Sequence, residues 1–279
     1  MSAPRQRGVA LLLVLWVLAL LTVMAAGLTA TGRSELALVD NALAAARFRA
    51  AADAALAEVA LRLTLPPGRL DGPLWRGGAT PHPWTFGGER LEVRIQDLGG
   101  LIDLNRADPA RLADLLRVLG VEPGRAVRLA AVIVDWRDGD ALTRAGGAED
   151  ADYRALGRAF GARDGDLPLV DELALLPGMT PELVAALAPL TRVTGDAGGI
   201  ARAFAPAAVL AALDGLGLEQ AQALRAARET DPRLRGGPRY RVEVRARDGG
   251  WRLLALLELS ADPGRPYRVR WRRLVYPGA

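Results

Sequence analysis

The stretch Val9–Ala30 reads VALLLVLWVLALLTVMAAGLTA and contains no charged residue. A helix of about 20 apolar residues is long enough to cross a bilayer, so the stretch predicts a membrane-spanning helix over residues 9–32. Arg5 and Arg7 lie before it, and positive charge favours the cytoplasmic side. We therefore expect a single pass through the cell inner membrane, with the rest of the chain in the periplasm.

Three kinds of segment could account for this apolar run. A cleaved signal peptide usually has a shorter run of about 7–15 apolar residues, and a plain signal anchor is the second explanation. The third depends on Gly8, because the charged leader ends at Arg7-Gly8 and the apolar run starts directly after it. This boundary resembles the leader of type IV pilins and pseudopilins. The resemblance implies that residues 1–8 form a leader, that a prepilin peptidase cuts between Gly8 and Val9, and that the new N-terminus is methylated.

The composition excludes several classes of enzyme. The chain has 279 residues, no cysteine and a single histidine, His82, and all its other basic residues are arginines. Without cysteine it has no disulfide, thiol nucleophile or Cys/His zinc site, and without lysine it has no Walker-type phosphate loop. A Ser-His-Asp triad would need His82, which we expect in a loop between Pro81 and Pro83 with no serine nearby. We therefore predict a protein that is not an enzyme.

Residues 33–98 predict a helix followed by the first strands of a sheet. Apolar side chains recur at helical spacing over residues 33–64, and Pro66-Pro67-Gly68 ends the pattern. The Gly- and Pro-rich residues 65–83 predict a loop. Residues 84–96 predict a hairpin, because apolar and polar residues alternate on the far side of Gly87-Gly88.

Residues 231–279 predict strands that complete the same sheet. Tyr240, Val242 and Val244 alternate with charged residues. Two later strands are expected at Trp251–Leu259 and around Tyr267, Val269 and Trp271. If both sets of strands join, they form one antiparallel sheet that packs on the helix 33–64, in a layout that resembles pilins. The predicted fold class is α+β, with residues 99–230 as a large inserted all-α domain.

The insertion contains three pairs of short helices joined by tight turns. The expected pairs are Ala110–Leu119 with Arg125–Trp136, Asp171–Leu176 with Thr180–Leu190, and Ala205–Leu213 with Leu218–Arg228. They resemble helix-hairpin-helix units, which in DNA-binding proteins present backbone N–H groups to a phosphate. This leaves one alternative function, a membrane-anchored DNA-binding protein of the competence type. The turns at Gly178 and Gly217 have no neighbouring cation in the sequence, which favours a structural role and no nucleic-acid partner.

An acidic segment lies inside the insertion. Its closely spaced carboxylates are Asp135, Asp138, Asp140 and Glu149. Ca²⁺ accepts six to eight oxygen ligands in flexible geometry, so these side chains could converge on one ion. Their spacing is not that of an EF-hand loop. The alternative is a solvated loop whose carboxylates cap helices or pair with Arg137 and Arg144.

In order and spacing, these motifs resemble the K protein family of minor pseudopilins in type II secretion systems. The matching segments are the leader ending at Gly8, Gly99–Asn105, Asp135–Asp140, Gly147–Glu149 and Leu176–Gly178. Leu13 stands at the fifth position after the expected cleavage, where most pseudopilins carry glutamate, and this departure fits the K family.

The resemblance implies a place and a set of partners. A K protein caps the tip of the pseudopilus with the minor pseudopilins I and J and helps to initiate its assembly, in a machine that exports folded periplasmic proteins across the outer membrane. The resemblance also implies a structural Ca²⁺ ion at Asp135, Asp138, Asp140 and Glu149. Prepilin peptidase and the inner membrane are the other implied partners.

Overall fold

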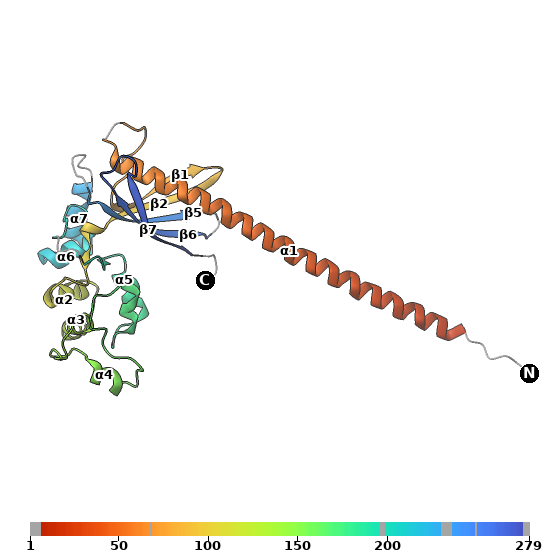
Figure 1. Cartoon of the computed structure of the whole chain (residues 1–279), viewed down its shortest axis with the longest axis horizontal. Helices are drawn as coiled ribbons and strands as arrows, with labels where there is room; N and C mark the ends of the chain where they lie inside the picture. The colour runs from red at the N-terminus through yellow and green to blue at the C-terminus, as the bar shows by residue number, and fades with distance from the viewer. Residues whose placement is uncertain (1–6, 67–68, 196–198, 230–235, 249, 276–279) are drawn as a thin grey trace, which may run out of the picture.

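A long helix carries a head made of two parts (Figure 1). This computed structural model describes residues 7–66, 69–195, 199–229, 236–248 and 250–275, with their side chains except those of residues 7–10, 25–37, 79 and 229. The helix α1 (Arg7–Thr64) is 58 residues long, and its N-terminal part extends away from the head. Among the described residues, no helix has both the length and the apolar character needed to cross a membrane. The predicted leader and membrane span fall partly outside the described side chains, and both stay predictions.

Five antiparallel strands form the sheet of the head, in the order β1-β2-β5-β6-β7. Their bounds are β1 (Gly78–Phe86), β2 (Glu89–Asp97), β5 (Arg239–Ala246), β6 (Arg252–Leu259) and β7 (Tyr267–Val275). β2 pairs with β5, which places Val93 opposite Val244 and joins strands that lie far apart in the sequence. The predicted combination of helix and antiparallel sheet is therefore confirmed.

The C-terminal half of α1 packs on one face of this sheet. Ala52 and Ala55 are completely buried, and these small side chains let the helix backbone lie close to the strands. The strand residues that face α1 alternate with partly exposed ones, as expected for a sheet with one face on a core. They include Leu91, Val93, Ile95, Val242, Val244, Ala255 and Leu257. The helix ends at Thr64, two residues before Pro66, because the residue before a proline disfavours helical geometry.

The first strand begins earlier than the sequence predicts. Residues 65–83 read as a loop, but residues 78–83 belong to β1. Pro81 and Pro83 are tolerated there because β1 is an edge strand, where a missing N–H costs no hydrogen bond to a neighbour. His82 therefore lies in a strand and not in a loop. It is 9% exposed, and its ring stacks on Trp75 with the ring centroids 5.1 Å apart.

The chain between β2 and β5 forms the second part of the head. Its elements are η1 (Leu98–Gly100), β3 (Ile102–Asp103), α2 (Pro109–Val118), α3 (Pro123–Arg137), α4 (Asp150–Ala155), η2 (Val170–Leu175), α5 (Pro181–Leu187), β4 (Thr191–Arg192), α6 (Ala207–Asp214) and α7 (Leu218–Glu229). The helices expected before and after the turns at Gly120 and Gly217 are present. The helix-hairpin-helix geometry of these pairs stays a prediction.

Two details of the predicted insertion are wrong. The segment Asp171–Leu176, expected as an α-helix, is mostly the 3-10 helix η2. The insertion is also not entirely helical, because β3 and β4 pair in parallel, with Ile102 opposite Thr191. Strands of two residues are too short to show the alternation by which a strand is recognised.

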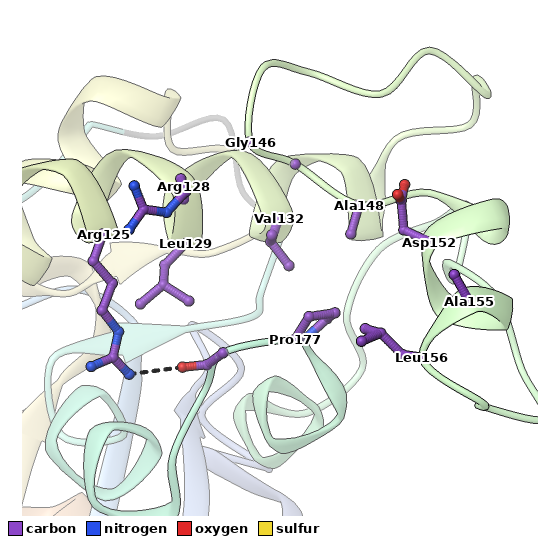
Figure 2. Close-up of a pocket in the computed structure, with 12 residues that line it drawn as sticks. Arg125, Arg128, Leu129, Val132, Gly146, Ala148, Asp152, Ala155, Leu156 and Pro177 are labelled. Atoms are coloured by element: carbon purple, nitrogen blue, oxygen red, sulfur yellow. Dashed lines mark hydrogen bonds between the residues drawn. The ribbon is translucent and has the colours of Figure 1, made fainter.

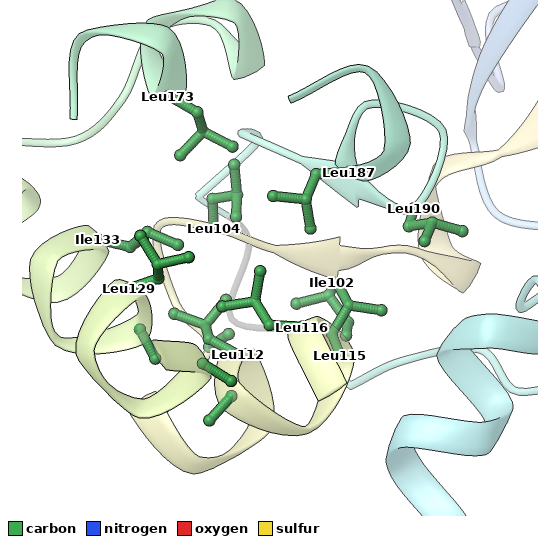
Figure 3. Close-up of a cluster of buried hydrophobic side chains, with 14 of the residues drawn as sticks. Ile102, Leu104, Leu112, Leu115, Leu116, Leu129, Ile133, Leu173, Leu187 and Leu190 are labelled. Atoms are coloured by element: carbon green, nitrogen blue, oxygen red, sulfur yellow. The ribbon is translucent and has the colours of Figure 1, made fainter. Parts of the chain in front are cut away.

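A separate hydrophobic core fills the insertion (Figure 3). Leucines of α2 pack between α3 on one side and β3 on the other. The labelled side chains of this core are Ile102, Leu104, Leu112, Leu115, Leu116, Leu129, Ile133, Leu173, Leu187 and Leu190. This core is distinct from the one between α1 and the sheet, so the insertion buries apolar surface of its own.

Asp97, the last residue of β2, forms hydrogen bonds with the chain at both ends of the insertion. Its side chain is fully buried and accepts hydrogen bonds from the N–H of Gly99 at 2.7 Å and from the N–H of Gly237 at 2.6 Å. Burial raises the pKa of Asp97, and the two backbone hydrogen bonds oppose that rise. Gly77 must lack a side chain here, because a Cβ atom would lie 2.6 Å from the Cβ of Asp97.

Candidate metal centre

Asp135 lies in the last turn of α3 and organises the loop that follows. It is completely buried. Its Oδ2 accepts hydrogen bonds from the backbone N–H groups of Arg144 and Ala148, both at 3.1 Å, and its Oδ1 accepts one from Arg144 Nη1 at 2.7 Å. Gly147 lies against this carboxylate, and a Cβ atom at Gly147 would be 1.8 Å from Asp135 Oδ2. Asp135 therefore fixes the path of residues 144–148.

The other three predicted ligands converge on one point. One oxygen each from Asp138, Asp140 and Glu149 lies within 4.8 Å of the others. Asp138 follows α3 directly, and Glu149 directly precedes α4. The structure thus brings together three of the four predicted carboxylates. Asp135 is not one of the three, and both of its oxygens already accept hydrogen bonds from Arg144 and Ala148.

Two oxygens of this group are buried without a partner. Asp138 Oδ1 and Glu149 Oε1 have no hydrogen-bond partner, although Glu149 as a whole is only 5% exposed. A buried, unpaired carboxylate oxygen is costly, and a bound cation would remove that cost. This observation distinguishes the cluster from an ordinary solvated acidic loop.

The electrostatics point in the same direction. Burial, followed by the negative charges of Asp135, Asp138, Asp164 and Asp140, raises the pKa of Glu149 to about 7. Like charges in one site oppose ionisation, and a divalent cation would reverse this effect. A donor set made only of carboxylate oxygens suits a hard cation such as Ca²⁺.

Arg144 places a positive charge next to the acidic cluster. Arg144 pairs with Asp135 at 2.7 Å and also with Asp138, and these hydrogen bonds raise the pKa of the Arg144 guanidinium. Arg137 does not pair with the cluster, because its guanidinium donates to the carbonyl oxygens of Leu104 and Ala107. The alternative to a metal site is a solvated loop whose carboxylates pair with Arg137 and Arg144. Of these two arginines, Arg144 forms the expected ion pairs and Arg137 does not.

Residues that the spacing does not reveal also surround the site. Asp164 is a non-glycine residue with a positive φ of 55°, and its charge reaches Glu149. Trp136, Tyr153 and Phe160 form an aromatic cluster with ring centroids 5.4–6.2 Å apart. Tyr153 Oη and Trp136 Nε1 are buried without a hydrogen-bond partner. Burial, and then the charges of Glu149 and Asp135, raises the pKa of Tyr153.

Comparison with known proteins bears on this region directly. Residues 97–196, which include all four carboxylates, match the family described as Type II secretion system (T2SS), protein K. This chain is related to the type II secretion K proteins. The resemblance inferred from the sequence is thereby confirmed.

Individual relatives agree with this assignment. The Type II secretion system protein K of Klebsiella pneumoniae is 35% identical over 214 residues, which is 69% of this chain and 64% of that protein. The protein of the same name from Pseudomonas aeruginosa is 33% identical over 193 residues, which is 61% of this chain and 57% of that protein. The chain thus spans about 57–64% of the length of these relatives.

A solved structure shares the fold. A chain in the crystal structure of the GspK-GspI-GspJ complex from the enterotoxigenic Escherichia coli Type 2 Secretion System aligns with a TM-score of 0.58. The alignment covers 88% of this chain and 99% of that chain, at 18% sequence identity. At this identity, the match supports the fold alone.

The other predicted sites stand apart from this centre. The expected cleavage site between Gly8 and Val9 falls among residues whose side chains lie outside the described part. The residues next to Gly178 in the sequence suggest a turn without a cation. The structure places one there, because Arg125 Nη2 donates to the Gly178 carbonyl oxygen at 2.9 Å. Since Arg125 belongs to α3, only the fold reveals this contact.

Proposed function

We propose that this chain is a minor pseudopilin of a type II secretion system, which caps the tip of the pseudopilus and helps to initiate its assembly. The observation that carries the proposal is the match of residues 97–196 to the K protein family, within a head borne on a single long helix. In this proposal residues 9–32 anchor the chain in the inner membrane, and the head lies in the periplasm. The role is that of a structural subunit and not of an enzyme.

Two features of the chain favour the terminal position. The insertion adds a second body to the head, with its own core, and so widens the subunit beyond a sheet and one helix. Leu13 lies where a carboxylate would cost about 2.5–3.5 kcal/mol in the bilayer unless a partner neutralises it. A terminal subunit has no neighbour on that side to supply the neutralising charge, so an apolar residue is the stable choice.

The partners follow from the same proposal. The related fold occurs in a complex named for GspK, GspI and GspJ, and we extend this to minor pseudopilins I and J of the same system. The test is to purify the full chain in detergent, mix it with the I and J proteins and measure the mass by light scattering. We expect a 1:1:1 complex. Self-association into a filament without I and J would contradict the tip position, and steeply salt-dependent binding to duplex DNA would favour the competence-type alternative.

Processing by prepilin peptidase is the first prediction. Gly8→Glu should block cleavage, because a bulky charged side chain replaces the residue that precedes the cut. The chain should then keep residues 1–8, a difference that intact-mass measurement resolves at once. The matched control is Gln6→Glu, which adds the same charge two residues earlier and should leave cleavage unchanged. Loss of residues 1–8 from cells without the peptidase would contradict this prediction.

Calcium binding at the centre is the second prediction. A ligand that binds only the folded state stabilises it by about 2.7 kcal/mol at a concentration 100 times its Kd. For a chain of this size, that corresponds to a rise in melting temperature of about 5–10 °C. We expect this shift when Ca²⁺ replaces chelator, measured by calorimetry on the full chain in detergent.

The control for this prediction is a pair of variants. The double variant Asp138→Asn/Glu149→Gln removes two converging oxygens and should abolish the shift. Asp114→Asn changes a carboxylate on α2 that pairs with Arg117 and does not belong to the cluster, so it should keep the whole shift. A melting temperature that is the same in Ca²⁺ and in chelator would rule out the site.

A further inference from the structure

Among the described residues, two arginines of α3 form no close ion pair. Backbone hydrogen bonds, and after them the charge of one of these arginines, Arg128, lower the pKa of Glu122 at the start of the helix. Arg125 and Arg128 lie about one turn apart, and like charges at this spacing repel each other. The side chain of Arg125 donates to a neutral carbonyl oxygen, that of Gly178. The side chain of Arg128 has no hydrogen-bond or ion-pair partner among the described residues. Other arginines of the insertion do pair with carboxylates: Arg106, Arg117, Arg144, Arg154 and Arg163.

Both arginines line a pocket of about 520 Å³ (Figure 2). Leu129 and Val132 of α3 form its floor, and Ala155 and Leu156, at and just beyond the end of α4, lie across from them. Leu156 is 60% exposed although it is large and apolar. The pocket has the size of a site for a small ligand or a few side chains, with an apolar lining and few polar groups.

The wall of this pocket is held in place by the protein. Residues 146–148 form one side of it, and Asp135 fixes their path through the N–H of Ala148. Gly146 packs on the stem of Arg128, since a Cβ atom there would lie 2.7 Å from Arg128 Cγ. This contact orients the Arg128 guanidinium along the rim, so the pocket is formed before any ligand arrives.

The charges of the pocket are separated. The two arginines stand at one end and Asp152 stands at the other (Figure 2). A carboxylate is therefore attracted to the arginine end and repelled from the opposite end. A nucleic-acid backbone fits this pocket poorly, because it carries charge along its whole length and offers nothing to the apolar floor.

We propose that this pocket binds an acidic peptide segment of another protein. A carboxylate of the segment pairs with Arg125 and Arg128, and the apolar side chain next to it lies on Leu129 and Val132. Charge-assisted pairs with arginine are strong and directional, and the apolar contact adds selectivity for a neighbouring aliphatic residue. None of the four carboxylates of the metal centre lines this pocket, and the proposed binding does not depend on the place of the chain in a pseudopilus.

The test uses two capped pentapeptides and the full chain in detergent. The first probe has the sequence Asp-Leu-Ala-Asp-Leu, and the second has asparagine in place of both aspartates. We expect the acidic probe to bind about tenfold more tightly than the neutral probe at low salt, measured by titration calorimetry. Equal binding of the two probes, or no binding of either, would overturn the proposal.

Matched variants locate the binding. Ala155→Trp fills the pocket and should abolish binding, whereas Ala151→Trp adds the same group one turn earlier on α4, outside the pocket, and should leave it unchanged. Arg128→Gln removes no hydrogen bond or ion pair among the described residues and should weaken binding of the acidic probe about fivefold to tenfold. Arg268→Gln, a change of the same charge on the exposed strand β7, should have no effect. Binding that survives Ala155→Trp, or a 12-base-pair duplex that competes with the peptide, would overturn the assignment.

Discussion

Asp135→Ala is expected to lower the free energy of unfolding of the insertion by about 2–4 kcal/mol, because it leaves the buried N–H of Ala148 and two donors of Arg144 without their acceptor. The N–H groups of Arg144 and Ala148 both donate to this carboxylate, and so does the Arg144 guanidinium. Without it, residues 144–148 lose the contact that fixes their path. Thermal unfolding and amide hydrogen exchange over α3 and α4 measure the loss, with chelator present so that no metal contributes.

The contrast for this variant is Asp140→Ala. Asp140 belongs to the same cluster but is exposed, and its side chain accepts a hydrogen bond from the N–H of Leu142 at 2.8 Å. In chelator its replacement should cost less than about 1 kcal/mol, as for a typical solvated hydrogen bond. If both variants lose the same free energy of unfolding in chelator, Asp135 does not organise the loop. The two carboxylates would then not differ in their structural role.

The acidic site shows what sequence spacing can and cannot reveal. The spacing of Asp138, Asp140 and Glu149 is sufficient to nominate them, and the fold brings their oxygens together. The same spacing gives Asp135 an equal role, although it is buried against Arg144 and backbone N–H groups. Burial and hydrogen-bond saturation separate a ligand from a support, and neither is encoded in the distance between residues along the chain.

The fold follows the same pattern. Long, regular segments are predictable, because α1 and the strands of the sheet repeat their apolar positions at a fixed period. The pairing of β2 with β5 could also be anticipated, since each strand has one apolar face that must be buried in the same core. The start of β1 could not, because Pro81 and Pro83 are acceptable only at a sheet edge, and edge position is a property of the assembled sheet. The pair β3–β4 is set by contacts across nearly ninety residues.

Asp97→Ala is expected to have the second large effect, a loss of about 2–5 kcal/mol in the free energy of unfolding of the head. The change removes the acceptor for the N–H groups of Gly99 and Gly237, which lie at the entry and the exit of the insertion, and each orphaned donor costs about 1–3 kcal/mol. Hydrogen exchange should rise first at the ends of β2 and β5. Asp248→Ala is the matched control, because Asp248 forms an exposed ion pair with Arg90, and such pairs contribute little.

The pH dependence of stability gives Asp97 a second, independent signature. Burial raises the pKa of Asp97 in the folded state, so between the ordinary aspartate pKa of about 3.9 and the raised value, the folded state binds more protons than the unfolded state. Stability from this group is therefore present at low pH and is lost as the pH rises through the folded pKa. Asp97→Asn keeps the shape of the side chain but cannot titrate, so the difference in free energy of unfolding between the native chain and this variant should change over that range and then become constant. A difference that does not vary with pH from 3 to 8 would show that Asp97 is not buried at the junction between the sheet and the insertion.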